Sequence, residues 1–80
     1  MFGLQQKWEV FQRLATSEIP MADNEVVRMQ LARRAANISI QLVDANFMDR
    51  SKVISDEWER LIKVVGQYLD GEKKAIEGKL

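Results

Sequence analysis

The arginines are the best candidates for chemistry in this chain, because it contains no cysteine and no histidine. Without those residues, the usual zinc sites, disulfides and histidine-assisted nucleophiles are excluded. Arg28, Arg33 and Arg34 lie close together in sequence, and a guanidinium fork can bond two oxygens of a phosphate or carboxylate at once. We therefore regard these three as a candidate site for an anion or an acidic partner. The competing interpretation is a solvated helix flank whose arginines pair with Glu25, Asp44 or acids of a partner.

Other catalytic arrangements find little support in the residue pattern. Gly66 and Gly71 are isolated, so the chain has no glycine-rich phosphate loop. Glu57 and Glu59 are two positions apart and do not share a helix face, which argues against a carboxylate pair. We predict that the protein is not an enzyme and uses no cofactor and no metal.

The composition indicates one small globular domain, residues 1–80, with 46% hydrophobic and 30% charged residues. Twelve basic residues balance twelve acidic ones, and this balance also holds locally, so nucleic acid is not an expected partner. No apolar run approaches the roughly 20 residues of a membrane span, and the N-terminus lacks the pattern of a signal peptide. We expect a cytoplasmic protein that does not bind membranes. A chain this small buries only about 60% of its unfolded surface, so a second copy is an available source of stability.

The pattern of apolar residues predicts an all-α fold of three antiparallel helices, over residues 4–17, 24–48 and 54–70, with 71–80 helical or frayed. Pro20 lacks an N–H and separates the first two helices. Either Ser17 caps a second helix with Pro20 in its first turn, or Asp23 caps one that starts near residue 24; we favour Asp23. Ser51 and Ser55 are the two candidate caps of the third helix.

The second predicted helix carries two apolar stripes that lie nearly opposite each other at about 100° per residue. One consists of Val26, Met29, Ala36, Ile40, Val43 and Phe47, with Arg33 on the same side. The other consists of Val27, Leu31, Ala35, Ile38, Leu42 and Ala45, and a narrow band of Arg28, Ala32, Ser39 and Asn46 separates the two on one side.

Two architectures explain a helix with two stripes. In a monomeric three-helix bundle, the first and third helices each cover one side. In a hairpin-like layer, a second copy of the chain covers one stripe, and we favour this homo-oligomer because opposed stripes suit a flat layer. Trp8, Trp58 and Tyr68 also fall on apolar stripes, which favours a place in the hydrophobic core. If part of a stripe stays exposed, we expect Trp8 and Phe11 on the short first helix to be the residues that contact a partner. The predicted interface residues are Trp8, Phe11, Val26, Met29, Ala36, Ile40, Val43 and Phe47.

These features favour a non-enzymatic helical interaction protein, a small regulator, inhibitor or adaptor, that binds another protein and itself. The first alternative is an oligomer that encloses a small anion or nucleotide, using Arg33, Arg34 or Lys63. The second is a nucleic-acid-binding regulator, suggested by three helices. The zero net charge and the absence of glycine from the turn at 46–52 argue against that second alternative.

Overall fold

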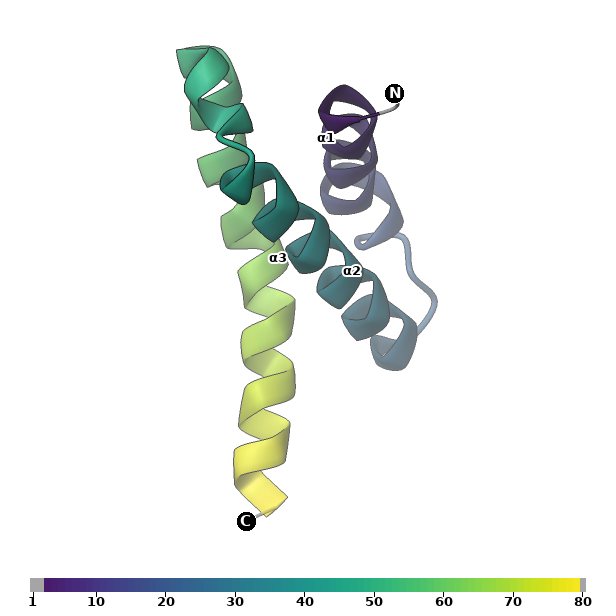
Figure 1. The fold of residues 1–80 in the computed structure, drawn as a ribbon. Coiled ribbons are helices and arrows are strands. Elements are labelled where there is room, and N and C mark those ends of the chain that lie inside the picture. Colours follow the sequence, from purple (N-terminus) through teal and green to yellow (C-terminus); the bar gives the residue numbers. More distant parts are fainter. Residues whose placement is uncertain (1–2, 80) are drawn as a thin grey trace.

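Three helices and two short helical turns make up the chain in a computed structural model, which describes the backbone of residues 3–79 and the side chains of residues 3–69. The elements in order are α1 (Leu4–Arg13), the π-helical turn η1 (Leu14–Glu18), α2 (Glu25–Asp44), the 3₁₀ turn η2 (Phe47–Arg50) and α3 (Lys52–Lys79). No strand occurs among residues 3–79, so the predicted all-α three-helix fold is confirmed. Helices α1 and α2 lie side by side, and α3 crosses α2 and extends well past both of them (Figure 1).

The first helical segment is predicted over residues 4–17; it ends one residue later, at Glu18, and its last five residues form a π-helical turn. Helix α1 continues into η1, and the Ile19 N–H bonds the Leu14 carbonyl five residues back at 2.9 Å. Pro20 follows directly and cannot donate a hydrogen bond, and the chain continues as a turn in which the Met21 N–H bonds the Ser17 carbonyl at 3.0 Å. The turn leaves Ile19 fully buried, which anchors the connection between α1 and α2 to the core.

The start of α2 is one residue later than predicted, and its cap is Asn24 rather than Asp23. Asn24 has extended backbone angles, and its side-chain oxygen accepts the Val27 N–H at 2.9 Å. This is the usual geometry of an N-cap, which satisfies one of the free donors of the first turn.

The end of α2 also differs from the prediction, because the helix stops at Asp44 rather than at residue 48. Asn46 adopts left-handed angles with φ 58°, a conformation in which asparagine is tolerated far better than most residues. Phe47 therefore belongs to the following turn, where it is fully buried.

Ser51 is the cap of α3, which settles the choice between the two predicted serines. Its side-chain oxygen accepts the N–H of Val53 at 3.1 Å and that of Ile54 at 3.4 Å. The helix thus begins at Lys52, two residues earlier than predicted, and its backbone remains helical to Lys79. Gly71 does not end it.

The hydrophobic core lies between the three helices and includes the aromatic residues of α1 and η2. Trp8 is 4% exposed and stacks on Phe11 with ring centroids 5.8 Å apart, and it also contacts Phe47 at 5.8 Å. These three aromatic side chains were expected at an interface with a second molecule. Because the chain's own helices cover them, that expectation is corrected: they are core residues of the single chain.

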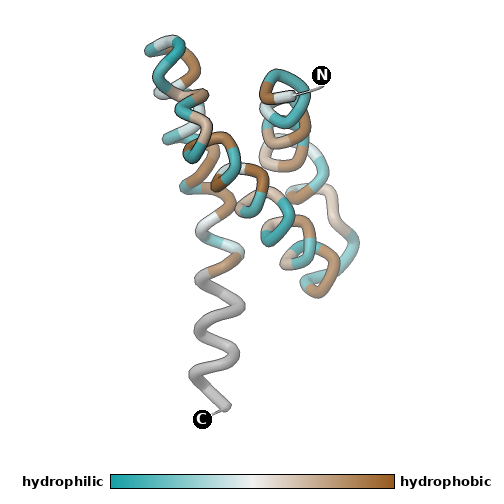
Figure 2. Tube along the Cα trace, viewed as in Figure 1, coloured by the Kyte–Doolittle hydropathy of each residue, from teal (hydrophilic) through white to brown (hydrophobic). Residues whose placement is uncertain are grey.

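The contact face of α2 is centred on the narrow band between the two predicted stripes. Ala32 and Ser39 from that band are buried, together with Ala35 and Leu42 on one side of it. The two stripes are therefore the two edges of one wide contact face, with α1 on one edge and α3 on the other, as in the three-helix bundle alternative. Hydrophobic and hydrophilic segments alternate along α1 and α2, as expected for helices with one buried face (Figure 2).

Within the described part of the chain, no helix is long and apolar enough to cross a membrane.

Candidate functional site

An apolar groove runs between α2 and α3 and is the first candidate site. Its volume is ≈ 440 Å³, and we call it the α2–α3 groove. The residues that line it are Ala36, Ser39, Ile40, Val43 and Asp44 from α2 and Trp58 and Ile62 from α3.

Small residues on the contact face of α2 let α3 approach closely and leave the larger side chains at the groove's edge. Ser39 is 3% exposed, and its hydroxyl accepts the indole N–H of Trp58 at 2.7 Å. This hydrogen bond fixes the indole ring in the groove and satisfies a polar group that would otherwise be costly to bury.

Aliphatic side chains stand exposed along the α2 edge of this groove. Ile40 is 58% exposed and Val43 is 45% exposed, while Ala36, Trp58 and Ile62 are half-buried. Three of the predicted interface residues, Ala36, Ile40 and Val43, thus lie together in one apolar surface.

The two remaining predicted interface residues lie nearer the start of α2 and do not line the groove. Val26 is 62% exposed and Met29 is half-buried. They share the helix edge of Ile40 and Val43, because helical positions three, four and seven apart face the same way. The edge therefore extends the apolar surface beyond the groove along α2.

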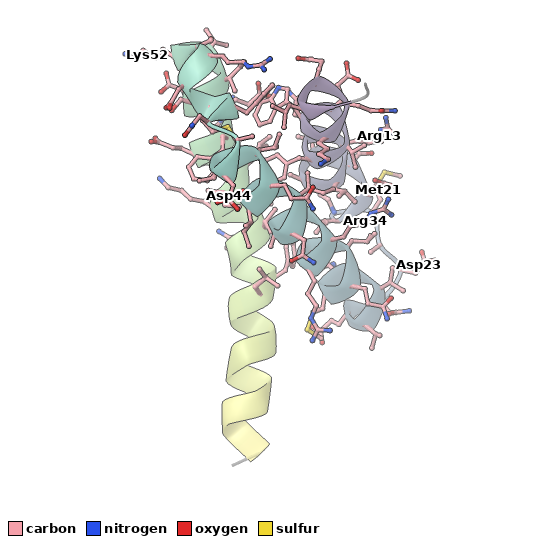
Figure 3. The ribbon with its side chains drawn as sticks, viewed as in Figure 1. Arg13, Met21, Asp23, Arg34, Asp44 and Lys52 are labelled. Atoms are coloured by element: carbon pink, nitrogen blue, oxygen red, sulfur yellow. The ribbon has the colours of Figure 1, made fainter. Side chains whose placement is uncertain are left out.

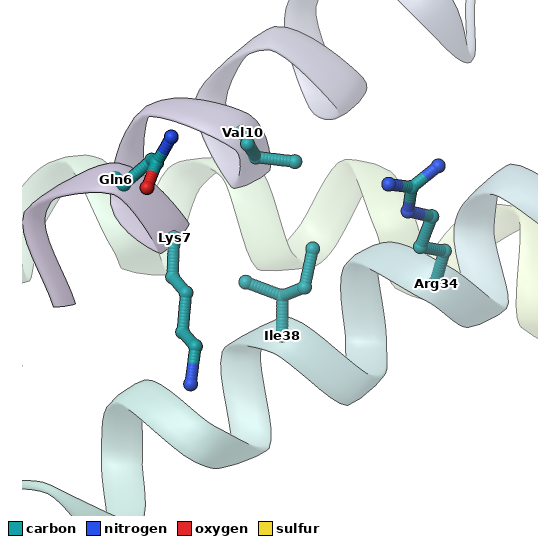
Figure 4. A pocket seen from close by; sticks show the side chains of 5 residues that line it. All are labelled: Gln6, Lys7, Val10, Arg34 and Ile38. Atoms are coloured by element: carbon teal, nitrogen blue, oxygen red, sulfur yellow. The ribbon is translucent and has the colours of Figure 1, made fainter. Parts of the chain in front are cut away.

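A second groove lies between α1 and α2 and has a different chemical character. It has a volume of ≈ 370 Å³, is lined by Gln6, Lys7, Val10, Arg34 and Ile38, and is called the α1–α2 groove below. In Figure 4 the aliphatic side chains of Val10 and Ile38 lie between Lys7 and Arg34, whose charged ends point in different directions. The groove combines an apolar strip with a cation at each end.

The three arginines predicted to form an anion site do not come together. Arg28 donates a hydrogen bond to the Ala22 carbonyl at 3.2 Å and lies 5.8 Å from the centroid of the Tyr68 ring, so it links the start of α2 to α3. Arg34 lies in the α1–α2 groove, whereas Arg33 is exposed on another face of α2. At about 100° per residue, these three positions point to three different sides of the helix. The expectation of one shared site is corrected.

The sequence interpretation missed two of the residues that define the grooves. The sequence pattern gives no signal for Lys7, which lines the α1–α2 groove together with Arg34 in the folded chain. Trp58 is predicted in the core; it does pack against the core but is only half-buried, and it also lines the α2–α3 groove. The hydrogen bond from Trp58 to Ser39 spans 19 positions, and helical periodicity carries no signal for such a pair.

Comparison with protein-family models, curated proteins and solved structures gives no match for this chain. The candidate sites therefore rest on the geometry and chemistry of its own residues. Among the described residues, no three acidic side chains gather as metal ligands would.

Proposed function

We propose that this protein is a non-enzymatic helical interaction protein that binds another protein and acts as a homodimer in the cytoplasm. The observation that carries the proposal is the α2–α3 groove, in which exposed Ile40 and Val43 stand beside half-buried Trp58 and Ile62. Contiguous apolar surface on a soluble chain is typical of a protein contact. We propose that a second copy of the chain occupies this groove.

The spacing along the exposed edge of α2 supports a second copy as the occupant. Counting from residue 26, the edge recurs alternately three and four positions apart within α2, through Val26, Met29, Arg33, Ala36, Ile40 and Val43. Such spacing is that of two helices packing along a common seam. Its central positions 33, 36, 40 and 43 are symmetric about the midpoint of Ala36 and Ile40, so an antiparallel copy related by a two-fold axis places Ala36 opposite Ile40 and Arg33 opposite Val43.

In that arrangement Ile40 of each copy lies opposite Ala36 of the other. A large side chain then fills the space beside a small one on both sides of the axis. Burying an exposed Ile40 or Val43 side chain in such a contact contributes on the order of 1 kcal/mol each. Both copies contribute, which favours association over the isolated chain.

Disulfide cross-linking tests this register directly, because the native chain has no cysteine. We would prepare Ala36→Cys and Ile40→Cys as separate variants, mix them and oxidise the mixture mildly. The proposal predicts that the mixture gives a cross-linked dimer faster than either variant alone, since position 36 meets position 40 of the other copy.

The matched control is Val53→Cys, because Val53 is 74% exposed on α3 and does not line the groove. It should cross-link only at the rate of random collision. Equal rates for the control and for the mixed pair would contradict the proposed dimer.

A further inference from the structure

We infer that the α1–α2 groove binds an acidic amphipathic helix of a partner protein, with an apolar side chain on Val10 and Ile38 and carboxylates at Lys7 and Arg34. This inference names the partner chemistry for the proposed interaction protein and rests on that proposal. It concerns a different surface from the one assigned to the second copy. Both surfaces can therefore be occupied at the same time.

The lining of this groove carries only positive charge, although the whole chain has a net charge of zero. Its lining contains Lys7 and Arg34 and no carboxylate. Positions two helical turns away continue the same surfaces of α1 and α2. On α1 this position is Arg13, two turns after Gln6, and Glu9 lies one turn before Arg13, outside the groove lining. On α2 the equivalent positions are Val27 and Gln41, which are uncharged.

The acidic residues of α2, Glu25 and Asp44, are the first and last residues of the helix, nine and ten positions from Arg34. Figure 3 shows Arg13 and Arg34 on the neighbouring helices α1 and α2, and Asp44 at the far end of α2. A partner with negative charge would therefore meet cations along this groove without facing a like charge in its lining. This charge complementarity selects an acidic occupant.

The apolar strip between the cations selects the form of that occupant. Lys7 and Arg34 lie at opposite ends of the strip with their charged ends pointing apart, so they do not converge on one small anion (Figure 4). Two carboxylates on either side of an apolar side chain match this layout. A helix presents such a pattern on one face when the three residues are spaced by single turns.

Nucleic acid fits the groove less well than an acidic helix does. Phosphate backbones are bound by many basic side chains at once. The aliphatic side chains of Val10 and Ile38 have neither a charge nor a hydrogen-bond donor for a phosphate. The lining residues Gln6, Lys7 and Arg34 are all exposed, so the groove is open to a macromolecule rather than enclosed around a metabolite.

A peptide titration tests the inference with a defined probe. The probe is a synthetic helical peptide with a central leucine and a glutamate one turn before and after it, and its twin carries glutamine in place of both glutamates. We expect the acidic peptide to shift the amide resonances of Gln6, Lys7, Val10, Arg34 and Ile38, and its twin to bind roughly tenfold more weakly.

Variants then show whether Lys7 and Arg34 are responsible for binding the acidic peptide. Lys7→Gln combined with Arg34→Gln should weaken the acidic peptide roughly tenfold, because two charge-assisted contacts are lost. The control is Arg60→Gln combined with Lys63→Gln, which removes the same charge from exposed positions of α3 and should leave the affinity unchanged. All three proteins should keep the same thermal midpoint, since the substituted side chains are exposed.

Several outcomes would overturn the inference. They are equal affinity for the two peptides, equal weakening by the two variant pairs, or no binding of the acidic peptide. Tighter binding of a DNA duplex or of inorganic phosphate to the same residues would also overturn it. If the acidic peptide instead shifts Ile40 and Trp58, the inference fails while the proposed interaction surface on α2 and α3 stands. Failure of the cysteine cross-linking test leaves these peptide results unaffected.

Discussion

The hydrogen bond between Trp58 and Ser39 joins two residues that line the α2–α3 groove, and we expect its removal to lower the stability measurably. In Ser39→Ala the indole N–H of Trp58 loses its acceptor at 2.7 Å. A lost hydrogen bond of this kind costs about 0.5–1.5 kcal/mol, and a donor left buried without a partner costs about 1–3 kcal/mol. Because Trp58 is only half-buried, water can replace part of the bond, so we expect a cost near the lower end.

Alanine also favours a helix over serine by about 0.5 kcal/mol, which offsets part of that loss. The net decrease in the free energy of unfolding should therefore be about 0.5 kcal/mol. For a domain of this size, that corresponds to a fall of about 2–4 °C in the melting temperature. The control is Ser55→Ala in α3, which gains the same propensity without disturbing the indole and should leave stability equal or slightly higher.

A double-mutant cycle isolates the hydrogen bond from the change in propensity. The free energies of unfolding of the native chain, Ser39→Ala, Trp58→Phe and the double variant are measured in urea by circular dichroism at one protein concentration. Phenylalanine keeps an aromatic ring but has no N–H. We expect a coupling energy of about 1 kcal/mol between the two positions. A coupling energy indistinguishable from zero would refute the claim that this bond holds Trp58 against Ser39 in the groove lining.

Three further predictions concern local backbone structure and can be checked in the same urea titrations. Asn24→Ala should lower the free energy of unfolding by about 1 kcal/mol, because the Val27 N–H loses its acceptor. Asp23→Ala should change it by less than about 0.5 kcal/mol, and equal losses would make Asp23 the true cap. Asn46→Val should cost about 1–2 kcal/mol because φ is 58°, whereas Asn46→Gly should be neutral or stabilising; a tolerated valine would contradict the left-handed turn. Gly66→Ala should stabilise the helix by about 0.5–1 kcal/mol, since a Cβ at this position meets no atom within 4 Å, and a loss of stability would show that the space is filled.

Helical periodicity predicts the elements of this fold well because it records which side chains are buried. The residues of the first helix that recur at helical spacing, such as Trp8 and Phe11, are buried in the structure. Proline and serine also indicate where helices end and begin. Pro20 follows the end of the first helical segment, and Ser51 caps the third helix. These signals are local, so a single sequence contains them.

The arrangement of α2 could not be predicted in the same way. Two stripes on a helix wheel suggest two separate contacts, yet the small residues Ala32 and Ser39 between them are the centre of one contact face. Small side chains score weakly in a hydrophobic pattern but permit the closest approach of a second helix. The end of α2 was missed for a similar reason, because the left-handed turn at Asn46 interrupts a pattern that Phe47 otherwise continues.

Candidate site residues were predicted only where they share an exposed helix edge. Ala36, Ile40 and Val43 lie together because positions three and four apart face the same way. The prediction that Arg28, Arg33 and Arg34 form one site was wrong, because these positions point to different sides of the helix. Lys7 and Arg34 line the same groove only because α1 packs against α2, which is set by tertiary contacts and leaves no spacing signal in the sequence.

The most direct test of the central claim is the molar mass of the native chain in solution, measured by light scattering on a sizing column across a series of concentrations. The proposed dimer in the α2–α3 groove predicts twice the 9.3 kDa of one chain at high concentration. It also predicts that Ile40→Ser, which removes an exposed apolar side chain, shifts the mass toward one chain. A constant mass of 9.3 kDa at every concentration would contradict self-association through this surface.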